Sequence, residues 1–286
     1  MNLEELIEEY VAEREATGHV NADTAAWLRR TLHGMAHALD CPPDEVTLTR
    51  GLRWLREMGC APRTVAVRTN TAKRFFAWCV ENEHLPRNPF AKIEPPKIHA
   101  GEPRFLEIDD VRRLVTVAVV PRDRAIVLCM VQMGLRRVEI HRALVTDLDW
   151  ADMTLAVRGK NYGGEVSRAL PIPDEAARAL KEWCMIRHRS SPWLFCTRTG
   201  GQLDPGDITR KITTLMRDAG VKKRSGDGLS PHALRHSFAQ HLVDDDVPIR
   251  TVQAALGHKS VQTTEMYLRR KVEVLRDALE GRQYGS

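Results

Sequence analysis

Residues 230–259 have the sequence SPHALRHSFAQHLVDDDVPIRTVQAALGHK, and Tyr267 follows eight residues later. Apolar residues recur in this stretch at helical spacing, which predicts one helix over 231–244 and a second over 248–256. The polar residues between them are histidine, arginine and tyrosine, which are residue types that can bind and attack a phosphate. The rest of the chain is therefore examined for residues that complete such a site.

The polar residues of this stretch have defined places on the predicted helices. His232 and Arg235 are three residues apart and share a helix face. His258 follows Leu-Gly just past a helix end, and Tyr267 comes nine residues later. Each residue alone also has an ordinary structural explanation, such as a capping histidine or a core tyrosine.

Two further residues come from upstream. Arg136 follows Gly-Leu at the expected start of a short helix that also carries Glu139. Lys160 lies in the turn Gly159–Gly164, between two runs that favour β-strands. Taken singly, an arginine and a turn lysine are most often solvated surface charges.

Several classes of protein are excluded by the sequence. It contains none of the Gly-x-x-x-x-Gly-Lys-Ser/Thr, Gly-x-Gly-x-x-Gly or Gly-x-Ser-x-Gly motifs. His232 and His236 have the spacing of a zinc helix, but Ala233 stands where that motif needs glutamate. No apolar run is long enough for a membrane span, and the scattered cysteines do not form a Cys-x-x-Cys pair. The net charge of +5 permits binding to nucleic acid.

Three segments, in this order, resemble the tyrosine recombinase family, also called the phage integrase family. Gly134-Leu-Arg136-Arg-Val-Glu139 resembles its first arginine box, and Pro231-His232-Ala-Leu-Arg235-His236-Ser-Phe-Ala resembles its second. Leu256-Gly-His258, with Thr263-Thr264 and Tyr267, resembles its nucleophile segment. The resemblance covers the whole chain. Arg137 stands where a small or apolar residue is commoner.

The resemblance implies a site-specific DNA recombinase with six catalytic residues. Tyr267 is the expected nucleophile, which would form a 3′-phosphotyrosyl link and leave a free 5′-hydroxyl. The roles expected of the others are phosphate binding for Arg136 and Arg235, hydrogen bonding for His258, general base for His232 and general acid for Lys160. The link conserves bond energy, so neither ATP nor a metal nor any other cofactor is expected. Glu139 is expected to be a structural partner of Arg136.

The N-terminal third is predicted to be a small helical domain, residues 1–92. We expect a first amphipathic helix with Leu3, Leu6, Ile7, Tyr10 and Val11 on one face. Further helices are expected after Asp23 as N-cap, from Thr47 to Met58, and after Pro62. The inward positions in the third are Leu48, Leu52 and Leu55. A proline-rich linker, 93–104, then precedes a catalytic domain, 105–286. By resemblance the first part is a SAM-like core-binding domain, and the two domains would form a DNA clamp without an arm-binding domain.

The second part is predicted to be mainly α with a three-stranded antiparallel sheet. The expected strands are 144–148, 154–157 and 166–172. Helices are expected near 109–117, 123–133, from Arg136, and over 174–188 and 207–219. Beyond the two of the opening stretch, two more are expected over 260–270 and 271–280.

The partner implied is double-stranded DNA at recombination sites. Basic residues that would contact phosphates, chosen from two arginine- and lysine-rich groups, are Arg104, Arg113, Arg210, Lys211, Lys222 and Lys223. By resemblance the protein assembles as a homotetramer on two DNA sites, with a directionality factor as a further possible partner. No membrane partner is expected, and the place of action is the bacterial cytoplasm or nucleoid.

Alternatives remain at this point. The favoured role is integration of a phage or other mobile element. A Xer-like recombinase that resolves chromosome or plasmid dimers, a DNA-binding relative without catalysis, and a type IB topoisomerase-like enzyme remain open.

Overall fold

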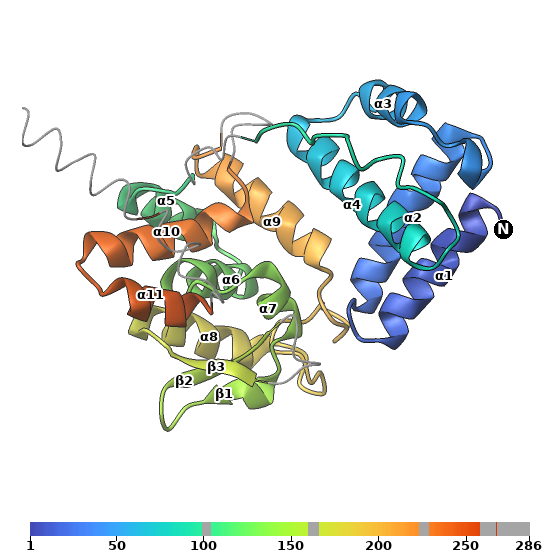
Figure 1. The fold of residues 1–286 in the computed structure, drawn as a ribbon. Coiled ribbons are helices and arrows are strands. Elements are labelled where there is room, and N and C mark those ends of the chain that lie inside the picture. Colours follow the sequence, from blue (N-terminus) through green and yellow to red (C-terminus); the bar gives the residue numbers. More distant parts are fainter. Residues whose placement is uncertain (99–103, 160–165, 223–228, 258–266, 268–286) are drawn as a thin grey trace, which may run out of the picture. The chain divides into compact units, whose positions relative to one another are not determined.

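The computed structural model describes residues 1–98, 104–159, 166–222, 229–257 and Tyr267. It divides into two compact units, Met1–Gly101 and Glu102–Ser286 (Figure 1). Most of the described chain is helical, with one three-stranded antiparallel sheet, so the predicted fold class is confirmed. Within the described residues, no helix has the length and hydrophobicity needed to cross a bilayer.

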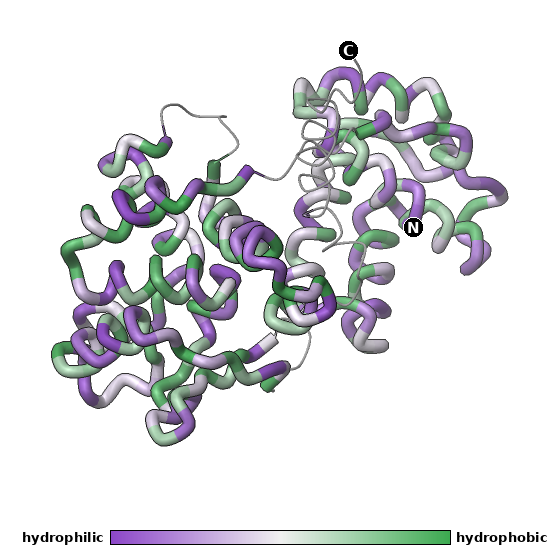
Figure 2. The backbone as a smooth tube through the Cα atoms, turned by 90° about the vertical axis from the view of Figure 1, so that its left-hand side faces the viewer, coloured by the Kyte–Doolittle hydropathy of each residue, from purple (hydrophilic) through white to green (hydrophobic). Residues whose placement is uncertain are grey.

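The first unit consists of helices packed around an aromatic core. Its elements are α1 (Leu3–Ala16), α2 (Ala22–Leu39), a short 3-10 turn (Pro43–Glu45), α3 (Leu48–Glu57) and α4 (Pro62–Glu81). Tyr10 of α1 meets Phe75 and Trp78 of α4 edge to face, with ring centroids 5.6 and 5.4 Å apart. Hydrophobic and hydrophilic residues alternate along these helices, as expected when one face is buried (Figure 2).

Two details of this unit differ from the sequence-based expectation. Helix α2 is capped by the side chain of Asn21, which accepts from the backbone of Thr24, so the cap predicted at Asp23 is wrong by two residues. Helix α3 presents a different face to the core. Leu48 and Leu52 are 40% and 49% exposed, whereas Trp54 is buried.

The rotation of α3 has a steric cause. Gly51, one turn before Trp54, lets the ring of Phe90 approach so closely that a Cβ would lie 2.9 Å from it. The Trp54 and Phe90 rings then pack edge to face at 6.0 Å. An indole buries far more apolar surface than a leucine, so the face with Trp54 and Gly51 is the one that turns inward.

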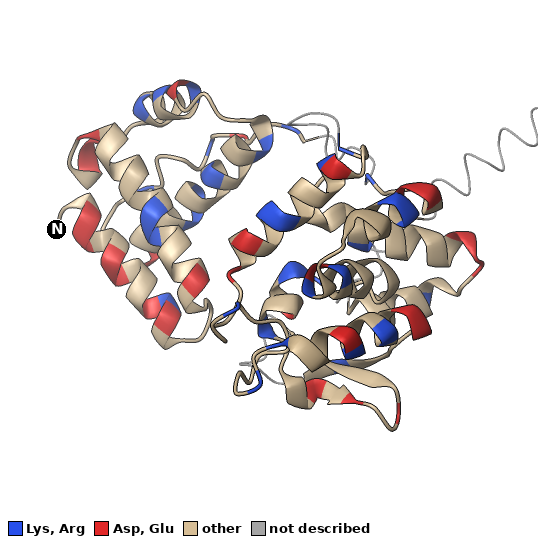
Figure 3. Ribbon diagram, turned by 180° about the vertical axis from the view of Figure 1, so that it is seen from behind, with Lys and Arg blue, Asp and Glu red and all other residues tan. Residues whose placement is uncertain are grey.

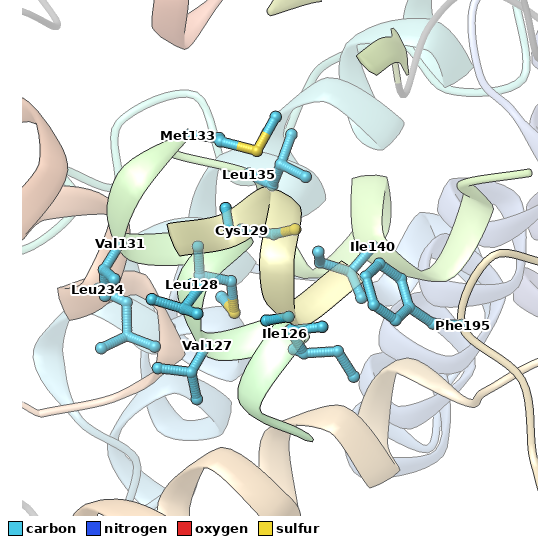
Figure 4. Close-up of a cluster of buried hydrophobic side chains, with 14 of the residues drawn as sticks. Ile126, Val127, Leu128, Cys129, Val131, Met133, Leu135, Ile140, Phe195 and Leu234 are labelled. Atoms are coloured by element: carbon cyan, nitrogen blue, oxygen red, sulfur yellow. The ribbon is translucent and has the colours of Figure 1, made fainter. Parts of the chain in front are cut away.

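The second unit has helix α6 at its centre. Its helices are α5 (Ile108–Val117), α6 (Pro121–Gln132), α7 (Arg137–Arg142), α8 (Asp174–Ile186), α9 (Pro205–Asp218), α10 (Pro231–Asp244) and α11 (Ile249–Leu256). Residues 125–131 of α6 are all buried. Their side chains meet Ile140 of α7, Leu234 of α10 and Phe195, which follows α8 (Figure 4). Helix α6 therefore fixes the positions of the helices that carry Arg136 and Arg235.

The sheet lies at one side of the second unit, with strand order β1-β2-β3 (Figure 1). Its strands are β1 (Leu148–Asp149), β2 (Thr154–Arg158) and β3 (Val166–Pro171). The strand predicted over 144–148 is wrong in extent, because most of it forms a 3-10 turn, Val145–Asp147. The Asp147 carboxylate accepts from the backbone N–H of Leu144 at 2.8 Å, and this local hydrogen bond competes with strand pairing.

A left-handed glycine joins α6 to the first arginine. Gly134 has φ of +64°, and a Cβ at this position would overlap the Phe238 ring of α10. Glycine is therefore required at position 134 for two reasons, the positive φ and the close approach of α10.

We predict that Gly134→Ala destabilises the protein by more than its conformation alone requires. Gly220 has a similar φ of +68° but nothing within 4 Å of its Cβ position, so Gly220→Ala is the matched control. The control should lose about 1 kcal/mol. Gly134→Ala should lose about 1–3 kcal/mol more, because the Phe238 ring must move. Urea denaturation followed by circular dichroism measures both, and equal losses would show that the Phe238 contact does not matter.

Candidate active site

The first arginine sits at the start of α7 and is held by a residue of the same turn. The backbone N–H of Arg136 donates to one Glu139 carboxylate oxygen at 2.8 Å, and its guanidinium Nη1 donates to the other at 2.8 Å. The Arg136 side chain keeps 32% exposure, so its outer face is open to an incoming anion. The expectation that Glu139 is a structural partner of Arg136 agrees with this contact.

Glu139 is the buried anion of the site. It is 4% exposed and receives two parallel hydrogen bonds of 3.0 Å from Arg168 of β3. The Nη1 atom of Arg235 lies 3.9 Å from the same carboxylate. Burial by itself raises the pKa of Glu139, but the hydrogen bonds and charge of Arg168, with help from Arg136 and Arg235, outweigh it and lower the pKa. Glu139 is therefore ionised at neutral pH.

The second arginine is buried and binds backbone carbonyls from two segments. Arg235 of α10 is 4% exposed, and it donates from Nη1 to Gly134 O and from Nη2 to Leu256 O. Desolvation, followed by the charge of Arg136, lowers its pKa to about 9. At neutral pH the guanidinium is still charged, so Arg235 joins the ends of α6 and α11 and adds positive charge to the site.

The C-terminal end of α11 is held by arginines of the same cluster. Arg168 donates from Nε to Ala255 O at 2.8 Å, and Arg136 Nη2 lies 3.5 Å from Gly257 O. Gly257 ends the helix with φ of +63°, and a Cβ there would lie 3.0 Å from a nitrogen of Arg168. Guanidinium groups stabilise the exposed carbonyls at the negative end of a helix dipole.

The tyrosine is buried against α10. Tyr267 is 1% exposed, and its hydroxyl lies 2.6 Å from Nδ1 of His236. Burial raises the pKa of Tyr267 to about 12, against the smaller opposing effects of the positive charges on Arg235 and Arg136. Tyr267 is thus near both arginines and is fully protonated at neutral pH.

His236 was not among the predicted catalytic residues. The sequence does contain a signal for it, because His236 lies one helical turn after His232 and directly after Arg235. The imidazole rings of His232 and His236 have centroids 6.4 Å apart. Desolvation, then the charges of His232 and Arg235, lower the pKa of His236 to about 4. His236 is therefore neutral.

His232 occupies the first turn of α10 and remains exposed. Although its ring has access to solvent, partial desolvation lowers its pKa, and the charges of Arg235, Arg137 and Arg136 lower it further. A neutral His232 can accept or donate a hydrogen bond beside these arginines. In the described part of the chain, the hydrogen bond of the Tyr267 hydroxyl goes to His236 and not to His232.

The structure therefore brings four predicted residues into one neighbourhood, namely Arg136, His232, Arg235 and Tyr267. Lys160 and His258 lie outside the described residues. The described chain stops next to both, at Gly159 before the lysine and at Gly257 before the histidine.

The predicted DNA-binding residues fall into different environments. Arg104 is exposed, and Arg113 and Arg210 are exposed residues that pair with Asp110 and Asp207 of their own helices. Lys211 pairs with Asp123 at 3.2 Å.

The last two predicted DNA-binding residues are Lys222 and Lys223. Lys222 is 9% exposed and donates to Leu229 O at 2.9 Å, which gives it an internal structural contact. Lys223 lies outside the described residues. Basic and acidic positions are interspersed over both units (Figure 3).

Comparison with known proteins identifies the family. Residues 104–273 match the model of the phage integrase family. Tyrosine recombinase XerC of Chromohalobacter salexigens is 31% identical over 280 residues, which is 92% of this chain and 91% of the relative. Tyrosine recombinase XerA of Pyrococcus furiosus is 32% identical over 238 residues, which is 81% of this chain and 78% of the relative.

The fold is shared with a solved integrase structure. A lambda integrase dimer bound to a COC' core site superposes with a TM-score of 0.77, at 18% identity, over 92% of this chain and 97% of the integrase. At this identity the likeness establishes the fold alone. The chain belongs to the phage integrase family, and it is a tyrosine recombinase, a class of enzyme that exchanges DNA strands at specific sites.

We predict that Glu139→Gln destabilises the protein and also impairs DNA cleavage. Breaking a buried ion pair costs about 3–5 kcal/mol, because it leaves charge uncompensated. Asp147→Asn is the matched control. Asp147 is also 4% exposed, and it pairs at 2.6 Å with Arg158 of β2. Both variants should melt at lower temperature. At a temperature at which both are folded, only Glu139→Gln should cleave slowly, and equal cleavage by the two would contradict a role of Glu139 in placing the arginines.

The lowered pKa of Glu139 also predicts a pH dependence of stability. Its contribution is complete above 4.5, the ordinary pKa of a free glutamate, and is lost as pH falls through the lower pKa of the folded state. The difference in unfolding free energy between the native chain and Glu139→Gln should thus be constant above about pH 5 and shrink below it. Denaturation at a series of pH values measures this, and a difference that stays constant down to about pH 3 would contradict it.

Proposed function

We propose that Tyr267 cleaves one DNA strand by attacking a phosphodiester. The attack forms a 3′-phosphotyrosyl link and releases the 5′-oxygen, and the 5′-hydroxyl of another strand later displaces Tyr267 from that link. The observation that carries the proposal is the burial of Tyr267 with its hydroxyl 2.6 Å from His236, the residue that follows Arg235, where the charges of Arg235 and Arg136 act on it. A phosphodiester is an anion that resists nucleophiles, and preorganised donors lower the barrier by stabilising charge in the transition state. Arg136 and Arg235 are held in place by Glu139 and by backbone carbonyls before any substrate arrives.

Each arginine contributes differently to this proposal. Arg136 has an open outer face and would bind one non-bridging oxygen directly. Arg235 is buried, so its charge reaches the phosphate with little screening by water. His232, exposed and neutral beside both, would add a hydrogen bond. By family resemblance, His258 would add another, and Lys160 would protonate the leaving 5′-oxygen.

The partners of the proposed reaction are DNA and further copies of the chain. We assign residues 1–92 to a core-binding domain, 93–104 to a linker and 105–286 to the catalytic domain. A lambda integrase tetramer bound to a Holliday junction has a TM-score of 0.78 to this chain at 18% identity, over 93% of this chain and 77% of the integrase. This shared fold supports assembly of a homotetramer on two DNA sites. We place the enzyme with DNA in the cytoplasm or nucleoid.

Two biological roles share this chemistry. The sequence favours integration of a phage or other mobile element. The relatives named XerC and XerA, of which the first matches over 91% of its length, favour a Xer-like role instead. Sequencing the junctions formed in a recombination assay with flanking host DNA distinguishes them. Insertion of a mobile element between host sequences supports the first role, and exchange between two copies of one chromosomal or plasmid site supports the second.

We predict that Tyr267→Phe abolishes covalent attachment to DNA. A nicked suicide substrate traps the covalent intermediate, which denaturing gel electrophoresis detects as a slower band. The wild-type chain should form this band without ATP or metal, and Tyr267→Phe should form none, while its binding to DNA in a mobility-shift assay stays unchanged. A covalent band from Tyr267→Phe would show that another residue is the nucleophile.

We also predict that Arg104→Gln reduces the salt dependence of DNA binding. An arginine that contacts one phosphate contributes about one unit to the slope of log affinity against log salt concentration. Arg178 is also an exposed arginine, lies on α8 and belongs to neither basic group, so Arg178→Gln is the control. Fluorescence anisotropy at several salt concentrations measures the slopes. Equal slopes for the two variants would remove Arg104 from the DNA-binding surface.

A further inference from the structure

One histidine of the second arginine box touches the reacting hydroxyl. His236 lies on α10 directly after Arg235, and its Nδ1 is 2.6 Å from the hydroxyl oxygen of Tyr267. This distance is typical of a strong hydrogen bond involving a hydroxyl. A general base must lie within hydrogen-bond reach of the proton that it removes, and this requirement of geometry comes before any consideration of pKa.

The direction of this hydrogen bond follows from burial. Tyr267 is 1% exposed, so its phenolic proton needs an acceptor inside the protein. Among the described residues, the acceptor within reach is Nδ1 of His236. A proton on Nδ1 would face the phenol and leave the phenolic O–H without a partner, which is costly in a buried place. The phenol therefore donates to Nδ1, and the histidine carries its own proton on Nε2.

We propose that His236 is the general base that takes the proton of Tyr267 during DNA cleavage. This inference rests on the proposed function and differs from the expectation from the sequence, which gave that role to His232. As the Tyr267 oxygen forms its bond to phosphorus, the phenolic O–H bond breaks and the proton passes to Nδ1. The bond from phosphorus to the 5′-oxygen breaks, and that oxygen takes a proton from a general acid. Rejoining runs the same steps in reverse, and the His236 imidazolium returns its proton to Tyr267.

The electrostatics of the resting site fit this role. Without DNA the phenol has a pKa of about 12 and His236 a pKa of about 4, so the proton stays on Tyr267. Positive charge on the neighbouring Arg235 disfavours an imidazolium at position 236. A bound phosphodiester adds negative charge beside Arg136 and Arg235, which offsets that repulsion. A bound substrate therefore lowers the cost of the transfer, and without substrate the proton stays on Tyr267.

His232 has a different position relative to the nucleophile. It is exposed at the first turn of α10, whereas His236 lies one turn further along and is half-buried with Tyr267. Among the described residues, the hydrogen bond of the Tyr267 hydroxyl is with His236, whose ring centroid lies 5.8 Å from that of the phenol. His232 is accordingly assigned to the phosphate and His236 to the phenol, so substitution of each should have a different signature.

The test measures the single-turnover rate of covalent complex formation on a nicked suicide substrate. His236→Ala should be slower than the wild type by about 10²–10⁴-fold, the usual contribution of general base catalysis. Imidazole and methylimidazoles added to His236→Ala should restore cleavage, and the restored rate should rise with the basicity of the added base. His236→Asn keeps an acceptor close to the place of Nδ1 but cannot take up a proton, and it should be as slow as His236→Ala.

Two controls separate proton transfer from structural effects. His241 lies on the same helix and binds Leu106 O through Nε2 at 3.0 Å, so His241→Ala should cleave at the wild-type rate and ignore imidazole. His232→Ala should be slow but should show no rescue that follows base strength. DNA binding and melting temperature are measured for every variant, and His236→Ala should bind DNA as the wild type does.

Three outcomes would overturn the proposal: cleavage by His236→Asn or His236→Ala within about tenfold of the wild type, failure of every added base to rescue His236→Ala, or rescue of His232→Ala instead. Failure of the proposed function looks different, because the wild-type chain itself would then form no covalent complex. If the wild type forms the complex, Tyr267→Phe does not, and His236→Ala matches the wild type, the function stands and only the role of His236 is lost.

Discussion

The Glu139 carboxylate is the interaction on which the site depends. It accepts hydrogen bonds from Arg136 and Arg168 and lies 3.9 Å from a nitrogen of Arg235, and so gathers residues from α7, β3 and α10. A buried carboxylate is tolerated only with such partners, and buried guanidinium groups equally need an anion. Three arginines around a single carboxylate leave an excess of positive charge. In the proposed reaction, a phosphodiester would supply negative charge that balances this excess.

Backbone carbonyls also hold this cluster in place. Arg235 binds the carbonyl of Gly134, and Arg168 and Arg136 contact carbonyls at the end of α11. Gly134 and Gly257 both have positive φ, and each is close to a group of the site, the Phe238 ring or Arg168. Gly134 of the first arginine box and Gly257 after α11 are therefore packing requirements of the arginine cluster. Helix α6, buried along most of its length, keeps these contacts in register.

Local patterns in the sequence predicted what depends on local physics. Helix periodicity predicted the buried faces of α1, α2 and α4, and the resemblance of two segments to the arginine boxes of the family indicated Arg136 and Arg235. The face of α3 was missed because the choice between its leucines and Trp54 depends on Phe90, which is distant in the sequence. Arg168 and His236 were missed for the same reason. Arg168 meets Glu139 across 29 residues and His236 meets Tyr267 across 31, and neither distance leaves a periodic trace.

The resting state of the nucleophile follows from the same burial that builds the site. A tyrosine exposed to solvent would have its ordinary pKa and could react with any electrophile that reached it. Burial against α10 instead raises the pKa of Tyr267 and lowers that of His236, so the proton remains on the phenol although its acceptor lies 2.6 Å away. Both shifts arise mainly from desolvation, and the positive charge of Arg235 adds to the second. In the proposed reaction, an anion bound between the arginines would oppose that charge, so activation of Tyr267 would depend on the presence of DNA.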